Sequence, residues 1–100
     1  MTSRYVLTNR AVEDLTEIWN YTYEVWSEDQ ANKYYEYLIE MCCEIAINPS
    51  LGRSYNEVKD EILGFRMNQH IIFYRLINSD VIEVIRILHG KMDLKSRLDL

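Results

Sequence analysis

Three arginines and one histidine in the C-terminal third of the chain are the residues best suited to chemistry. They are Arg66, Arg75, Arg86 and His89, and all four lie among strand-forming residues. Gathered on one open sheet face, the arginines would hold a phosphate or an oxyanion. His89 would then act as a general acid or base on an RNA ribose. This chemistry requires strands that bring the four side chains together.

The predicted strand pairing keeps these side chains apart. Residues 71–77 and 81–88 read as two strands, and Asn78-Ser79-Asp80 between them has the composition of a turn. In such a hairpin Arg75 faces Glu83 as a charge pair, whereas Arg86 faces Ile72 on the other side of the sheet. A register shift of one residue would reverse part of this. Separate structural roles are therefore favoured, and a shared anion site is the alternative.

Other reactive side chains give little sign of a site. His70 and His89 have no accompanying cysteine or carboxylate pattern, so a metal site is weakly supported. Cys42 and Cys43 are adjacent and do not readily bridge each other, and Cys42 falls on a buried stripe where a thiol is inert. We expect no catalytic residue, no metal, no cofactor and a reducing, cytoplasmic location.

Length and charge exclude several classes of protein. The 100 residues predict one domain, 1–100, with a formal net charge of -5. The eleven Lys and Arg are scattered without a run of three, which disfavours strong direct binding to nucleic acid. The first residues lack the apolar core of a signal peptide, and no apolar run approaches the roughly 20 residues of a membrane span.

Two amphipathic helices precede the predicted strands. A short strand at 5–8 leads to Thr8 or Asn9 as a helix cap. Ser27-Glu28-Asp29-Gln30 matches a capping box, so the first helix ends near Trp26 and the second begins at Glu28. Asn48-Pro49 stops the second helix. With almost no loop between them, the helices form an antiparallel hairpin.

The rest of the chain completes an α+β fold. Residues 49–63 read as a loop, strands follow from Gly64, and residues 93–98 form a short helix or a tail. The order β-α-α-β-β-β predicts a helical hairpin packed on a mainly antiparallel, four-stranded sheet whose other face is partly open.

Aromatic and acidic side chains on the hairpin suggest partner surfaces. Most of the aromatic side chains are expected in the core or at its rim. The aromatic area exceeds what a thin sheet would cover, which makes a groove for a partner helix the alternative. We assign this groove to Trp19, Tyr23, Trp26, Tyr34, Tyr37 and Leu38. An acidic outer face, formed by Glu13, Asp14, Glu17 and Glu24, is either solvated or a docking surface for a basic partner.

Short motifs follow one another in order over about residues 4–93. They are Tyr5-x-Leu7-Thr8-x-x-Ala11-x-x-Asp14-Leu15-x-x-Ile18, Gln30-Ala31-x-x-Tyr34, Asn48-Pro49-x-x-Gly52-Arg53, Gly64-Phe65-Arg66, His70-x-Ile72-Phe73-Tyr74-Arg75 and the closing Arg86-Ile87-Leu88-His89-x-x-Met92-Asp93. This ordered set resembles the ParE toxins of the RelE/ParE type II toxin–antitoxin superfamily, and the closing motif is the most diagnostic part.

The resemblance implies a RelE-like fold, a ParD-like antitoxin that neutralises the toxin, and DNA gyrase as the target. A hetero-oligomer is expected, two-to-two or larger, which contacts operator DNA only through the antitoxin. We assign target binding to the strand residues Arg66, Arg75, Arg86 and His89 together with Met92 and Asp93.

Two alternatives stay open at this point. One is a RelE-type, ribosome-dependent mRNA endonuclease, a class that resembles this chain in its basic sheet residues. Members of that class commonly carry a tyrosine just after the last strand, where this chain has Met92, and no tyrosine follows Tyr74. The other alternative is a non-toxic interaction module.

Overall fold

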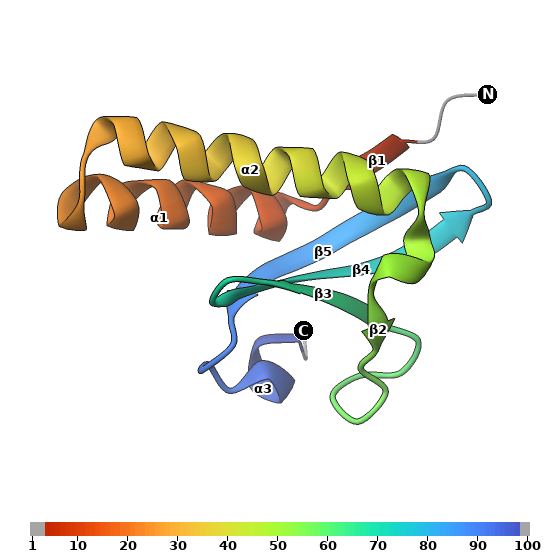
Figure 1. Cartoon of the computed structure of the whole chain (residues 1–100). Coiled ribbons are helices and arrows are strands. Elements are labelled where there is room, and N and C mark those ends of the chain that lie inside the picture. Colours follow the sequence, from red (N-terminus) through yellow and green to blue (C-terminus); the bar gives the residue numbers. More distant parts are fainter. Residues whose placement is uncertain (1–3, 99–100) are drawn as a thin grey trace.

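The computed structural model describes residues 4–98 and has the predicted α+β architecture (Figure 1). In chain order, its elements are β1 (Arg4–Leu7), α1 (Asn9–Val25), α2 (Glu28–Ile47), the 3-10 helix η1 (Pro49–Leu51), β2 (Arg53–Ser54), β3 (Leu63–Met67), β4 (His70–Asn78), β5 (Val81–His89) and α3 (Leu94–Leu98). None of the helices in this part of the chain is long and apolar enough to cross a membrane.

Local hydrogen bonds set the boundaries of the two long helices. The Thr8 hydroxyl accepts a hydrogen bond from the Ala11 amide at 3.0 Å, which starts α1. The Ser27 hydroxyl accepts one from the Gln30 amide at 3.1 Å, which starts α2. Each hydroxyl satisfies an amide that has no partner inside its helix. Both predicted caps and the hairpin between them are therefore confirmed.

The sheet has five strands in the order β1-β5-β4-β3-β2. β1 runs parallel to β5, and the other neighbours are antiparallel. The extra strand is β2, whose residues Arg53 and Ser54 pair with Gly64 and Leu63. The predicted number of four strands is wrong, because a strand of two residues has no alternation by which the sequence would reveal it.

The two faces of the sheet are covered differently. The helical hairpin packs on one face, and α3 lies on the opposite one (Figure 1). On the hairpin side the core includes Leu15, Leu38, Ile45, Tyr74 and Val84. On the other side α3 and the loop after β2 pack against β4 and β5 in a second cluster, formed by Tyr55, Ile62, Ile71, Phe73, Leu88 and Leu98. The face expected to be partly open is thus partly covered.

A bulge in β5 changes the register halfway along the final hairpin. Near the turn, Arg75 pairs with Glu83 as predicted, with 2.7 Å between Nε and Oε1. Farther along, Tyr74 pairs with Val84 but Phe73 pairs with Arg86, so Ile85 is an extra residue on β5. The predicted pairing of Arg86 with Ile72 is therefore wrong. Residue alternation alone does not reveal an inserted residue.

Candidate functional site

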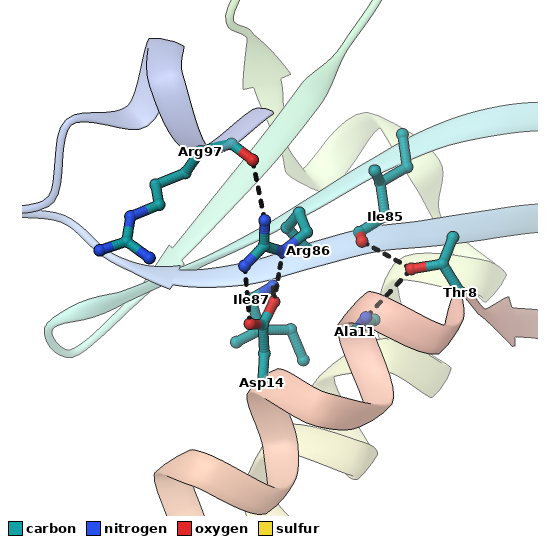
Figure 2. Close-up of polar contacts among 7 residues, drawn as sticks. All are labelled: Thr8, Ala11, Asp14, Ile85, Arg86, Ile87 and Arg97. Atoms are coloured by element: carbon teal, nitrogen blue, oxygen red, sulfur yellow. Dashed lines mark hydrogen bonds and ion pairs between the residues drawn. The ribbon is translucent and has the colours of Figure 1, made fainter. Parts of the chain in front are cut away.

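A side chain of α1 and that of its N-cap residue Thr8 complete the open edge of β5. β1 ends at Leu7, opposite Val84, so the edge of β5 beyond this point has no strand beside it. The Thr8 hydroxyl donates to the Ile85 carbonyl at 2.7 Å, and the Asp14 carboxylate accepts from the Ile87 amide at 3.0 Å (Figure 2). These two side chains supply the hydrogen bonds that a neighbouring strand would otherwise make.

Asp14 also forms a buried, bidentate ion pair with Arg86. The two oxygens of Asp14 lie 2.8 Å from Nε and 2.9 Å from Nη2 of Arg86, and each side chain is only 6% exposed. Nη1 of Arg86 donates to the Arg97 carbonyl of α3 at 2.8 Å (Figure 2). The hydrogen bonds to Asp14 raise the pKa of Arg86, and the guanidinium stays charged. These contacts of Asp14 and Arg86, called the joint below, connect α1, β5 and α3.

The placement of Asp14 corrects the predicted acidic outer face. Glu13, Glu17 and Glu24 are exposed, but Asp14 is buried. Ala11, Asp14, Leu15 and Ile18 follow the spacing of a single buried helix stripe, and this spacing was the signal for a buried Asp14. Its partner Arg86 is 72 positions away in the sequence, and nothing local identifies it.

A cleft of about 500 Å³ lies beside this joint. Its lining comes from α1, the start of β4, the end of β5, the segment that follows and α3. It includes Glu17, Tyr21, His70, Arg86, His89, Lys91, Met92 and Arg97. Three of the residues assigned to target binding, Arg86, His89 and Met92, therefore share one cleft. The wall carries both acidic and basic groups along with apolar ones, which suits a protein side chain better than a bare phosphate.

The other three residues assigned to target binding lie outside the cleft. Arg66 lies close by, since a Cβ added to Gly90 would be 2.7 Å from its Nη1 atom. Asp93 accepts a hydrogen bond from the Ser96 hydroxyl at 2.9 Å and caps α3. Arg75 pairs with Glu83 near the β4–β5 turn, at the far end of these strands. The sequence predicts that the basic residues do not converge on one site. Among the four of them, this holds for Arg75 only.

Two histidines meet at the cleft. The rings of His70 and His89 are 5.5 Å apart in an edge-on arrangement, and the Tyr34 hydroxyl lies 2.7 Å from Nδ1 of His70. The Lys91 amide donates to Nδ1 of His89, so Nε2 carries the proton of the neutral ring and donates to Gln69. Among residues 4–98, no group of three or more His, Cys, Asp or Glu side chains is placed to hold a metal ion.

The burial of His70 makes stability depend on pH. Desolvation lowers the pKa of His70 below its ordinary value of 6.5, and the charge of His89 lowers it further, while Asp14 opposes the shift. The unfolded chain therefore binds this proton more readily than the folded chain does. Stability is complete above the ordinary pKa of histidine and falls as the pH drops through it.

We expect the melting temperature to fall between about pH 7.5 and about pH 5.5, and to fall less in His70→Gln, which keeps a polar group without the titration. Calorimetric melting at the two pH values measures both drops. Equal drops in the two proteins would show that His70 is not the group responsible.

The residues assigned to the antitoxin groove lie in three environments. Trp19 and Tyr23 stack with 5.3 Å between their rings, and Trp26 is 73% exposed, so these aromatic side chains lie on the surface with Tyr37. Tyr34 is half-buried against His70. Leu38 is fully buried in the core, and its assignment to a surface groove is wrong, because it falls on the centre of the apolar stripe of α2.

The cysteines have the environments expected of them. Cys42 is buried and Cys43 is exposed, and both are free thiols. Burial raises the pKa of the Cys42 thiol to about 12, which keeps it protonated and unreactive.

Comparison with known proteins relates the whole domain to one group of toxins. The family model described as ParE toxin of type II toxin-antitoxin system, parDE, matches residues 5–94. The chain is 37% identical over 98 residues to Toxin ParE1 of Mycobacterium tuberculosis, covering 98% of this chain and 100% of that protein. It is 31% identical over 94 residues to Toxin ParE1 of Caulobacter vibrioides, covering 94% and 96%.

Solved structures of toxin–antitoxin systems have the same fold. A chain of the chromosomal ParDE system from P. aeruginosa superposes with a TM-score of 0.77 at 14% identity, over 90% of this chain and 98% of that one. A chain of the RelBE2 complex from Mycobacterium tuberculosis superposes with a TM-score of 0.69 at 13% identity, over 89% and 92%.

Proposed function

Because the chain belongs to the ParE toxin family and is the toxin component of a type II toxin–antitoxin system, we propose that it acts by binding DNA gyrase and that a ParD-like antitoxin neutralises it. The toxin stops replication by holding gyrase on broken DNA. It makes no chemical change of its own.

The observation that carries the proposal is the engagement of Arg86. A nuclease that worked on the sheet would need free cations around the reacting phosphate. Arg86 is the buried cation of the cleft, and Asp14 and the Arg97 carbonyl occupy its Nε, Nη1 and Nη2 atoms. Arg75 is engaged by Glu83 away from the cleft. Two of the sheet arginines are thus held in structural contacts instead of facing a phosphate, which supports a binding role.

We assign the target contact to the rim of the cleft. Met92 is 41% exposed there, His89 and Lys91 line the same cleft, and Arg66 lies against Gly90, between these two residues in the sequence. An exposed apolar side chain within a polar rim is the usual composition of a protein interface. The antitoxin is assigned to the helical hairpin, where the exposed aromatic side chains lie, in a hetero-oligomer.

One feature favours a second candidate, a ribosome-dependent mRNA endonuclease. His70, His89 and Tyr34 form a contiguous set of proton-transferring groups, and Lys91 and Arg97 line the same cleft. A neutral His70 would serve as a general base near neutral pH.

Induction of the toxin in cells that lack the antitoxin distinguishes these candidates. Gyrase poisoning is expected to switch on the DNA-damage response while transcripts stay intact. A nuclease would give cut transcripts and arrested translation without DNA damage, and an inert module would give neither. Transcript cleavage without DNA damage would overturn the gyrase proposal.

A further inference from the structure

The helical hairpin ends in a tip, residues 19–30, in which Thr22 is the only buried residue. Figure 1 shows the hairpin extending past the strands at the α1–α2 turn. No residue between Thr22 and Ala31 is buried. Large apolar side chains in this segment therefore add nothing to the core, and their presence calls for another explanation.

Most of the large side chains at the tip are apolar and open to solvent. Trp26 is 73% exposed, Tyr21 67%, Val25 53% and Tyr23 49%, and Trp19 stacks flat on Tyr23. Exposed apolar patches with a polar rim mark interaction sites, and Trp and Tyr are the side chains that contribute most to binding energy at protein interfaces.

The charges at the tip have one sign. Glu24, Glu28 and Asp29 lie within it, and no Lys or Arg occurs between Arg10 and Lys33. Within residues 4–98, none of these three carboxylates is in a salt bridge. Aromatic faces and carboxylates both attract cations, so a partner that covers this surface without leaving charge unpaired is cationic.

The chain itself shows how such a surface binds arginine. The guanidinium of Arg53 lies 3.7 Å above the ring of Tyr55, while its Nη1 atom is 3.2 Å from the carboxylate of Glu57. A guanidinium stacks on a ring and makes hydrogen bonds within its own plane at the same time, which the ammonium group of lysine does not do. The tip offers the same two groups without an arginine of its own.

We propose that the hairpin tip binds an arginine-bearing amphipathic segment of the antitoxin, with apolar side chains on the aromatic patch and guanidinium groups between the rings and Glu24, Glu28 and Asp29. This inference rests on the proposed antitoxin partnership. It adds the chemistry of the antitoxin segment and the place where it binds.

The test is an affinity measurement with the purified cognate antitoxin. Trp26→Ala and the double variant Glu24→Lys/Glu28→Lys are each expected to weaken binding by about tenfold or more. If the double variant does not fold, Glu24→Lys alone is measured. This variant is expected to fold, because a positive charge in the last turn of α1 suits the helix dipole. The matched control, Asp60→Lys/Glu61→Lys, makes the same change of charge at two exposed positions away from the hairpin, and it should stay within about twofold of the wild type.

A charge exchange tests the arginine directly. Changing the arginines of the antitoxin segment to glutamate should weaken binding to the wild-type toxin and restore it to Glu24→Lys/Glu28→Lys. Tip variants that fold and bind as tightly as the wild type would overturn the inference while leaving the antitoxin partnership intact. If the tip variants weaken binding but the charge exchange does not restore it, arginine is not the side chain that the tip binds. An antitoxin that fails to bind even the wild type would overturn the partnership itself.

Discussion

Replacing Asp14 by alanine is expected to lower the free energy of unfolding by about 3–5 kcal/mol. The substitution leaves the buried guanidinium of Arg86 without its counter-charge and the Ile87 amide without its acceptor. Removing one partner of a buried ion pair costs far more than the pair contributes, because the remaining charge stays desolvated. Urea denaturation followed by circular dichroism measures the loss.

Two further variants show whether the loss comes from the unpaired charge. The double variant Asp14→Leu/Arg86→Met removes both charges and should be more stable than Asp14→Ala, since it leaves no buried ion unpaired. Glu13→Ala, a change of the exposed neighbour, should stay within about 0.5 kcal/mol of the wild type. If Asp14→Ala were as mild as Glu13→Ala, the joint between α1, β5 and α3 would not be the support described above.

Replacing Leu38 by alanine is expected to lower the free energy of unfolding by about 2–5 kcal/mol. Leu38 is fully buried between α2 and the sheet, so the substitution opens a cavity and loses the burial of the side chain. The same urea denaturation measures it. Because Leu38 has no exposed surface, the folded variant should bind the antitoxin with unchanged affinity.

Tyr37→Ala is the matched comparison for Leu38→Ala. Tyr37 is adjacent in the sequence but 46% exposed, and its removal should cost little stability. A Leu38→Ala variant that keeps its stability but no longer binds the antitoxin would show that Leu38 belongs to the partner surface and not to the core.

Local signals account for the parts of the fold that the sequence predicts well. The hydroxyls of Thr8 and Ser27 act within one helical turn, and Pro49 acts on the residue before it, so the ends of both long helices are visible in short stretches of sequence. The β4–β5 turn likewise fixes the pairing of Arg75 with Glu83. Each of these features needs only neighbours along the chain.

The features that the sequence conceals all depend on distant residues or on irregular geometry. β2 consists of two residues and exists because β3 is beside it. The bulge at Ile85 moves Arg86 from Ile72 to Phe73, and that shift takes Arg86 out of the predicted pairing. Asp14 meets Arg86 across 72 positions, and Tyr34 meets His70 across 36. These contacts arrange the residues of the candidate site. The sequence therefore predicts the types of these residues but not their arrangement.

The most direct test of the account is a supercoiling and cleavage assay with purified gyrase and toxin freed of antitoxin. If the toxin binds gyrase, we expect inhibited supercoiling and trapped double-strand breaks, both relieved when the antitoxin is added. Normal supercoiling without breaks, at an excess of folded toxin, would contradict gyrase binding and turn attention to mRNA cleavage on the ribosome by the His70–His89 cluster.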